Sequence, residues 1–553
     1  MTHFVFITGG VISSLGKGLA AASLGAVLRA RGLRVCLRKV DPYLNVDPGT
    51  MSPYQHGEVF VMDDGTEADL DCGHYERFTD QDTTHKDTTT TGQIYQSVLD
   101  AERRGDYLGK TVQVVPHVTD RIKAFLRADT EDVDVLIAEI GGTVGDIEGL
   151  PFLEALRQLR LEEGRKMCVV HVGWVPYVKT AGEFKTKPLQ HSVKDLQHAG
   201  LQPDLLLLRC DQPLPDEVLA KVGLFCNVPQ KRVVCGMTQD DLYEVPLAYH
   251  AAGLDQGVLD CLEIKTPEAK LSAWQNYQTR RKAATDEVTV GVVGKYGSFP
   301  DAYRSLYEAL AHAGVAEGVR VTLRWIDPEV EKAENTSEPT PDAILVPGGF
   351  GTRGLEGTLA WIKRAREERV PYFGICLGMQ LAVIEAARAQ AGFEAANSAE
   401  FNPETPHPVI HQLRAWEKEG AAQTYEGGSR GYGGTMRLGA YPCCLKAGSL
   451  ARQVYGSETI SERHRHRFEV NEAYIPLIEG AGLHVVGRSP CGKLCEVVER
   501  DDHPFFIGVQ FHPELLSRPH RPHALFCGFA RAAQAYARER EPAKKLKEVV
   551  GGS

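Results

Sequence analysis

The chain has 553 residues, which is too long for a single hydrophobic core, so two to four domains are expected. Its hydrophobic content of 43% and charged content of 24% are those of a soluble globular protein, and the net charge of −11 argues against a general nucleic-acid or membrane-surface binder. This charge leads us to expect no nucleic acid among its partners. We also expect no membrane, because no apolar stretch reaches the length of a membrane span. Thirteen scattered cysteines without a visible signal peptide indicate reduced thiols and a cytoplasmic location.

The N-terminal region predicts a strand at 2–8, a glycine-rich turn, a helix at 19–31 and a strand at 35–40. This order begins a βαβ unit, and the turn resembles a P-loop whose backbone N–H groups hold phosphate. The standard pattern GxxxxGK[ST] fits poorly, because Gly18 replaces the Ser/Thr that normally ligates Mg²⁺. A metal there would need carboxylates from elsewhere. The alternative is an ordinary strand–helix turn.

Two acids stand where such a metal would need them. Asp71 lies in an acidic, loop-like stretch, and Glu139 ends a buried-looking strand at 134–140. Ligands of parallel α/β sheets bind at the carboxyl ends of strands. The position of Glu139 at a strand end therefore favours a metal ligand over a solvated surface charge. The basic stretch Lys185–Gln190 suits a triphosphate, although a solvated loop is an equal alternative.

Further strands predict a mostly parallel sheet covered on both faces, followed by a second domain. We expect a first domain at 1–264, a linker with some helix at 265–287, a second domain at 288–537 and a disordered tail at 538–553. The expected strands lie at 167–172, 204–208, 232–235, 289–293, 321–326, 343–346 and 371–375.

The second domain contains a nucleophile motif, Gly374-Ile-Cys-Leu-Gly378. Glycines two positions either side of Cys376 are typical of a sharp strand-to-helix turn, and the N-terminus of the helix expected from Met379 onward favours a thiolate. His512, after a strand at 505–511, could take the thiol proton, and Glu514 could orient its ring. The alternative of a buried structural cysteine does not explain all three residues. The pairs Cys443/Cys444 and Cys491/Cys495 lack a second pair at zinc-site spacing and are interpreted as structural.

These motifs resemble known families. The stretch 374–380 with 512–514 resembles the class I glutamine amidotransferases. Residues 1–262 resemble the amidoligase domain of the CTP synthase family, and the whole match runs from about residue 2 to 535. The matching segments are 13–18, 39–43, 45–53, 55–60, 73–78, 102–109, 139–148 and 185–188. The resemblance implies an α/β chain with a P-loop, Rossmann-like amidoligase domain similar to dethiobiotin synthetase and a class I amidotransferase domain.

The resemblance implies an ATP-dependent carbon–nitrogen ligase that aminates UTP to CTP through a 4-phosphoryl intermediate, with ammonia from glutamine. Lys17 and Lys39 would neutralise the transferring phosphoryl group, and Asp71 and Glu139 would hold Mg²⁺. The residues implied for ATP are Ser14, Leu15, Gly16, Lys17, Gly18, Leu19, Asp71, Met237, Thr238 and Gln239. Those implied for UTP and CTP are Ser13, Asp146, Ile147, Glu148, Lys185, Thr186, Lys187, Pro188, Leu189, Gln190 and Lys221. Those implied for glutamine are Gly349, Leu377, Gly378, Met379, Gln380, Glu400 and Arg467, with the N–H groups of Gly349 and Leu377 as oxyanion hole.

The resemblance also implies an internal ammonia passage near Pro53, His56 and Val59, and a mobile lid at 433–439 linked to activation by GTP. It further implies inhibition by CTP, a homotetramer with nucleotide sites between subunits, and assembly into filaments.

Three stretches depart from the family pattern: 81–91, Gly173-Trp174 and Leu189. None removes a proposed catalytic group. Two alternatives stay open: another P-loop amidoligase that acts on a cofactor carboxylate, and a nucleotide-binding assembly protein without catalysis. The presence of Lys17, Cys376, His512 and Glu514 argues against the second alternative.

Overall fold

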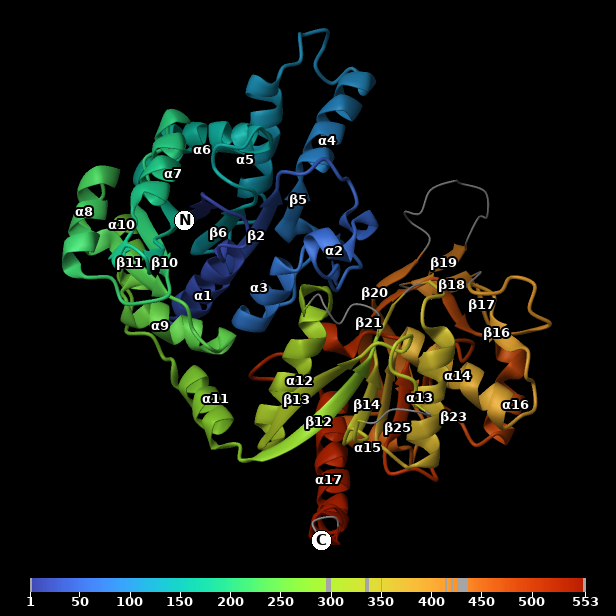
Figure 1. The fold of residues 1–553 in the computed structure, drawn as a ribbon. Coiled ribbons are helices and arrows are strands. Elements are labelled where there is room, and N and C mark those ends of the chain that lie inside the picture. The colour runs from blue at the N-terminus through green and yellow to red at the C-terminus, as the bar shows by residue number, and fades with distance from the viewer. Residues whose placement is uncertain are drawn as a thin grey trace. The chain divides into compact units, whose positions relative to one another are not determined.

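The computed structural model describes residues 2–294, 300–333, 338–349, 351–412, 415–418, 421–424 and 436–550. The chain forms two compact units, shown in Figure 1. Unit 1 comprises residues 1–48 and 70–278, and unit 2 comprises residues 49–69 and 279–553. Within the described part of the chain, no helix combines the length and the apolar character that a membrane crossing needs.

Unit 1 is built on a parallel seven-stranded sheet with the order β11-β10-β7-β1-β6-β2-β5. Most of its strand residues are apolar and buried, as expected for a parallel sheet with helices on both faces. The strands are β1 (His3–Gly9), β2 (Val35–Asp41), β5 (Thr88–Thr90), β6 (Val135–Ile140), β7 (Met167–Trp174), β10 (Leu205–Cys210) and β11 (Val233–Met237), with a small hairpin of β8 (Tyr177–Val178) and β9 (Glu183–Phe184).

Helices cover both faces of this sheet. One face packs against α4 to α8, and the other against α1, α9 and α10. The helices are α1 (Lys17–Ala30), α3 (Asp71–Thr79), α4 (Thr91–Arg104), α5 (Thr119–Arg127), α6 (Leu150–Glu163), α7 (Lys187–His198), α8 (Asp216–Cys226), α9 (Val245–Ala251), α10 (Leu254–Leu262) and α11 (Ser272–Ala283). The break between the units falls within α11.

Unit 2 is built on a mixed nine-stranded sheet with the order β13-β12-β14-β15-β25-β24-β23-β20-β21. The first five strands are parallel and the others antiparallel. The strands are β12 (Asp286–Val293), β13 (Val319–Ile326), β14 (Ala343–Val346), β15 (Tyr372–Ile375), β20 (Arg437–Leu445), β21 (Thr459–His466), β23 (His484–Arg488), β24 (Cys495–Glu499) and β25 (Phe506–Val509).

Two apolar cores flank the unit 2 sheet, one with α12 and α17 and one with α13, α14 and α16. The helices are α2 (Pro53–His56), α12 (Arg304–Glu317), α13 (Leu355–Glu367), α14 (Leu377–Ala389), α15 (Leu450–Tyr455), α16 (Ile475–Gly480) and α17 (Ala524–Val550). The smaller strands are β3 (Phe60–Val61), β4 (Glu67–Ala68), β16 (Ala396–Ser398), β17 (His407–Gln412), β18 (Ala415–Lys418), β19 (Ala421–Thr424) and β22 (Phe468–Val470).

The α/β class and every expected strand are confirmed, but four local features differ from expectation. Asp71 begins helix α3 rather than lying in a loop. The second half of the basic stretch 185–190 forms the first turn of α7, where Pro188 is favoured because its missing N–H is not needed. Helix α14 starts directly after Cys376 rather than at Met379.

The fourth difference concerns the expected disordered tail, because α17 continues through residue 550. Arg538 forms an ion pair with Asp286 at 2.8 Å, and the Arg540 guanidinium donates to the Thr340 carbonyl at 3.0 Å. These contacts anchor the helix beyond residue 537. The segment is also rich in Ala, Glu, Lys and Arg, which are strong helix formers.

Candidate active sites

The glycine-rich loop after β1 has an unusual backbone. Val11 has φ 88°, Ser14 has φ 58° and Gly16 has φ 90°, and the loop leads directly into α1 at Lys17. Positive φ is costly for a β-branched residue such as valine, and such strain gathers at ligand-binding loops. The conformation therefore favours a phosphate-binding loop over an ordinary turn.

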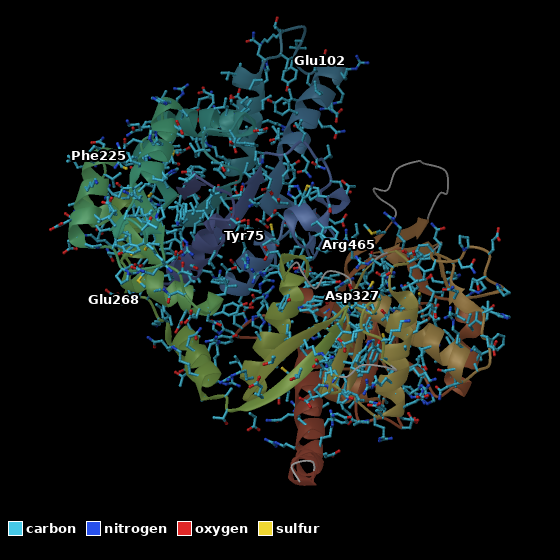
Figure 2. All side chains as sticks on the ribbon, in the orientation of Figure 1. Tyr75, Glu102, Phe225, Glu268, Asp327 and Arg465 are labelled. Carbon is cyan, nitrogen blue, oxygen red and sulfur yellow. The ribbon has the colours of Figure 1, made fainter. Side chains whose placement is uncertain are left out.

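A cluster of charges lies at the carboxyl ends of β1, β2 and β6. The Lys39 ammonium lies 2.6 Å from Asp71 Oδ2, 3.1 Å from Glu139 Oε1 and 3.5 Å from Asp41 Oδ1. Lys39 on β2 and Glu139 on β6 are register partners, so the sheet itself brings them together. The Tyr75 hydroxyl donates to Glu139 Oε2. Figure 2 labels Tyr75 among the side chains of this unit.

The carboxylates of this cluster fit a hard divalent cation. A Cβ at Gly18 would lie 1.9 Å from Asp71 Oδ1, so the missing side chain leaves the space that the carboxylate fills. The Asp71 carboxylate thus lies where the side chain of the Ser/Thr of a standard P-loop would begin. Three buried or half-buried carboxylates around one ammonium leave an excess of negative charge, which suits Mg²⁺.

The surroundings shift the pKa values of this cluster. Burial, and then the charge of Asp71, raise the pKa of Glu139 against the opposing influence of Lys39 and Lys17. Burial lowers the pKa of Lys17, although Glu139, Asp71 and Asp41 oppose this. The Lys17 ammonium donates to the Gly142 carbonyl at 2.6 Å. Because burial disfavours the charged form of Lys17, an anion in place of the neutral Gly142 carbonyl would stabilise its ammonium group.

The residues expected to bind the pyrimidine nucleotide lie on loops and on the start of α7. Ser13, Lys221 and the stretch 146–148 are exposed, and Lys185 and Lys221 both lower the pKa of Glu183. A buried chain of hydrogen bonds fixes α7 against the sheet: Thr8 Oγ1 lies 3.0 Å from His171 Nδ1, and Ser192 Oγ lies 2.8 Å from His171 Nε2.

Two of the departures from the family pattern meet in space. A Cβ at Gly173 would lie 2.0 Å from Leu189 Cδ1, and Leu189 is fully buried. The larger residue at 189 therefore occupies the volume that a side chain at 173 would take. The two changes compensate each other, and Leu189 acts as packing for the first turn of α7.

The stretch 237–239 lies where β11 ends. The Thr238 N–H donates to the Cys210 carbonyl at 3.0 Å, and Thr238 Oγ1 donates to Asp211 at 3.0 Å. The neighbouring Arg209 donates to the Gly236 carbonyl at 3.1 Å and to the Tyr249 hydroxyl at 3.0 Å.

In unit 2, Cys376 occupies a strained turn between β15 and α14, with φ 52° and ψ −100°. A Cβ at Gly374 would lie 2.7 Å from the Gly378 carbon, and a Cβ at Gly378 would lie 2.2 Å from the Val346 carbonyl oxygen. Glycine is therefore required at both positions, as the motif predicts. The thiol can donate to the Arg465 carbonyl at 3.9 Å, and the Gln510 amide donates to the sulfur at 3.6 Å.

His512 and Glu514 are joined by a bond of 2.8 Å between Nδ1 and Oε1. Burial alone would lower the pKa of His512, but the charges of Glu514 and Cys376 outweigh it and raise this pKa to about 10. Among the described residues, His512 Nε2 has no hydrogen-bond partner although it is buried. A Cβ at Gly348 would lie 2.6 Å from His512 Cε1, so the ring needs glycine beside it. A protonated His512 ring beside Cys376 fits a cysteine nucleophile with a histidine partner.

Five of the residues expected to bind glutamine line one small cavity of about 30 Å³ beside Cys376: Gly349, Leu377, Gln380, Glu400 and Arg467. Leu377 is the first residue of α14, so its N–H points to the helix N-terminus. Gly378 and Met379 are buried within α14 and hold the turn rather than line this cavity. The lid at 433–439 lies largely outside the described residues.

A second cavity of about 110 Å³ is lined by Cys376, His512 and Glu514 together with Glu58 and Val59. Residues 49–69 thus pack within unit 2 although they precede it in the sequence. Arg465, labelled in Figure 2, holds this segment through bonds to Glu67 at 2.7 Å and to the Gly49 carbonyl at 3.2 Å.

Comparison with known proteins decides the family. A family model described as CTP synthase N-terminus matches residues 3–264, and one described as glutamine amidotransferase class-I matches residues 298–532. The CTP synthase of Sphingopyxis alaskensis is 57% identical over 97% of this chain and all of its own length. The chain belongs to the CTP synthase family. The CTP synthase of Rhizorhabdus wittichii is 56% identical with the same coverage. The glutaminase domain of Trypanosoma brucei CTPS with bound acivicin is 35% identical over 45% of this chain and 94% of its own, with a TM-score of 0.39.

As a CTP synthase family member, the chain is a glutamine-hydrolysing carbon–nitrogen ligase with a synthetase domain and an amidotransferase domain. Sequence reasoning missed four residues at its sites: Asp41, Tyr75, Glu58 and Gln510. The period of two along a strand could have found Asp41, because it follows Lys39 by two positions on β2. Gln510 precedes His512 by two positions but lies after β25 ends at Val509. Tyr75 and Glu58 come from segments with no such signal.

Proposed function

We propose that this chain converts UTP, ATP and glutamine into CTP through a 4-phosphoryl-UTP intermediate. The observation that carries the proposal is the cluster of Lys39 with Asp41, Asp71 and Glu139, joined to a strained phosphate loop. A glutaminase alone has no use for such a cluster, whereas phosphoryl transfer depends on concentrated charge around the phosphates.

In the synthetase site, the stretch 14–19 holds the ATP phosphates, with 237–239 near adenine. Lys17 leaves the Gly142 carbonyl for a phosphate oxygen, and Lys39 neutralises charge on the transferring group. Asp71 and Glu139 would hold Mg²⁺, which would supply Lewis-acid chemistry to the phosphoryl group. Ser13, Asp146–Glu148, Lys185–Gln190 and Lys221 hold the pyrimidine nucleotide.

In the glutaminase site, the Cys376 thiolate attacks the glutamine amide, and the N–H groups of Gly349 and Leu377 stabilise the oxyanion. His512 donates a proton to the leaving ammonia and then activates water, while Glu514 keeps the ring oriented. Glu400 and Arg467 recognise the glutamine α-amino and carboxylate groups.

Ammonia then travels through an internal passage, because ammonium formed in bulk water is no nucleophile. The cavity that joins Val59 to Cys376 supports this route. We further propose activation by GTP, inhibition by CTP, a homotetramer that can stack into filaments, and a cytoplasmic location. The proposed domain limits are 1–264 and 288–537, joined by a linker at 265–287.

The test is CTP formation followed by ultraviolet absorbance, with either glutamine or ammonium chloride as nitrogen donor and with ATP and Mg²⁺ present. CTP from both donors supports the proposal. Glutamine hydrolysis with UTP inert and another carboxylate acceptor aminated would favour the alternative amidoligase.

A further inference from the structure

Two strands of the unit 1 sheet bring a pair of thiols together at the edge of the proposed ATP site. Cys210 is the last residue of β10, and Cys235 lies on the neighbouring strand β11. Their sulfur atoms are 3.2 Å apart. Closure to a disulfide needs only a movement of about 1 Å, to the usual S–S distance of about 2.05 Å.

The pair has the chemistry of a reactive dithiol. The Cys210 S–H and the Leu214 backbone N–H favour the Cys235 thiolate against the opposing effect of burial, and so lower the pKa of Cys235. Cys210 is fully buried, whereas Cys235 is half-buried on an edge strand of the sheet. Cys235 is therefore the nucleophile that an oxidant can reach, and Cys210 the resolving thiol.

The position of the pair connects it to nucleotide binding. Cys210 is the register partner of Met237, and its carbonyl accepts from the Thr238 N–H at 3.0 Å. Cys210 also belongs to the apolar cluster that contains Leu189 and packs against Met237. A contraction between β10 and β11 would thus move the stretch 237–239.

We propose that Cys210 and Cys235 form a peroxide-sensitive dithiol whose closure to a disulfide weakens ATP binding. The Cys235 thiolate attacks a peroxide oxygen, the O–O bond breaks, hydroxide leaves, and a sulfenic acid forms. The Cys210 sulfur then attacks Cys235, the S–O bond breaks, and water leaves with the Cys210 proton. The two sulfurs lose two electrons in total and hydrogen peroxide gains them.

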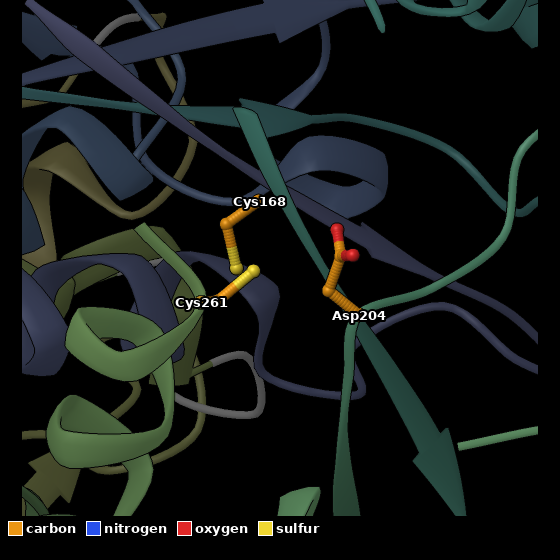
Figure 3. Close-up of side chains that lie close together, drawn as sticks. All are labelled: Cys168, Asp204 and Cys261. Atoms are coloured by element: carbon orange, nitrogen blue, oxygen red, sulfur yellow. The ribbon is translucent and has the colours of Figure 1, made fainter. Parts of the chain in front are cut away.

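A second thiol pair provides a matched control. Figure 3 shows Cys168 of β7 and Cys261 of α10 with their sulfur atoms facing each other beside Asp204. Cys168 lies near the start of β7, so this pair is at the opposite edge of the sheet from the phosphate loop. Asp204 forms an ion pair with Arg160 and accepts a hydrogen bond from the Val169 N–H at 2.8 Å. Its carboxylate is therefore satisfied by protein partners, which argues against a metal site at this pair.

The first experiment is non-reducing tryptic mapping of the full chain after treatment with hydrogen peroxide. The proposal predicts a cross-link between peptides 210–221 and 233–265 that is lost in Cys235→Ser and retained in Cys261→Ser. A link of 233–265 only to peptide 167–179, or no link at all, would overturn it. This arm does not depend on the proposed function.

The second experiment measures ATP dependence of CTP formation with ammonium chloride, which bypasses the glutaminase thiol. Peroxide should raise the KM for ATP by roughly tenfold, since a displacement of about 1 Å at a binding group is costly. Dithiothreitol should reverse the effect, and Cys235→Ser should lack it while Cys261→Ser keeps it. This arm rests on the proposed function. If the reduced protein forms no CTP, the proposed function fails. If the cross-linked protein is active and its KM for ATP is unchanged, the proposed regulation is overturned. Cys210→Ala serves in place of Cys235→Ser if the latter fails to fold.

Discussion

Gly18→Ala tests the synthetase site through a single methyl group. A Cβ at this position would lie 1.9 Å from Asp71 Oδ1, so the carboxylate must move away. The movement breaks the 2.6 Å ion pair between Asp71 and Lys39. Because hydrogen bonds to charged groups contribute about 1.5–3 kcal/mol, we expect kcat/KM for CTP formation to fall by about 10- to 150-fold.

The assay is CTP formation with ammonium chloride at varied ATP and Mg²⁺ concentrations, alongside glutamine hydrolysis by the same protein. Glutamine hydrolysis should stay at the level of the unchanged chain, because the triad belongs to unit 2. Gly480→Ala is the matched control, since a Cβ there meets no atom within 4 Å. Normal CTP formation by folded Gly18→Ala protein would refute the argument that this glycine makes room for the carboxylate.

Three further changes test other parts of the account. Glu514→Gln removes the charge that does most to raise the pKa of His512 to about 10. Because the ring is protonated only below its pKa, the alkaline limit of glutamine hydrolysis should move down toward neutral pH. An unchanged pH profile would contradict this. Gln510→Met removes the amide that donates to the nucleophilic sulfur at 3.6 Å, and should lower kcat for glutamine by about tenfold with ammonia-dependent synthesis unaffected. Gly173→Ala should raise the KM for UTP through the 2.0 Å clash with Leu189, and Leu189→Ala should rescue it; simple additivity of the two changes would speak against their compensation.

Much of the fold could be predicted from the sequence, because buried parallel strands read as continuous apolar runs and some helices, such as α4, α6 and α12, end at a glycine. The Cys376 turn was predictable for a similar reason: its chemistry and its backbone needs lie in five consecutive residues. His512 and Glu514 are two positions apart and share one structural role.

The remaining parts of the site depend on distant packing. Tyr75 reaches Glu139 only because α3 packs against α1 and the sheet. Glu58 reaches the cavity of the triad because a segment from the N-terminal part of the chain folds into unit 2. Neither position carries a local pattern, since long-range contacts leave no periodicity in the sequence. The sequence likewise shows Leu189 and Gly173 as two separate departures from the family pattern, but it does not show that the two residues pack against each other.

In the proposed function, Cys376 serves only as an ammonia source for a separate synthetase site. The decisive variant is Cys376→Ala, assayed for CTP formation with glutamine and, in parallel, with ammonium chloride. We expect the glutamine-dependent reaction to fall to background and the ammonia-dependent reaction to continue at the rate of the unchanged chain. Loss of both reactions in a folded protein, or glutamine-dependent CTP formation without the thiol, would contradict this expectation.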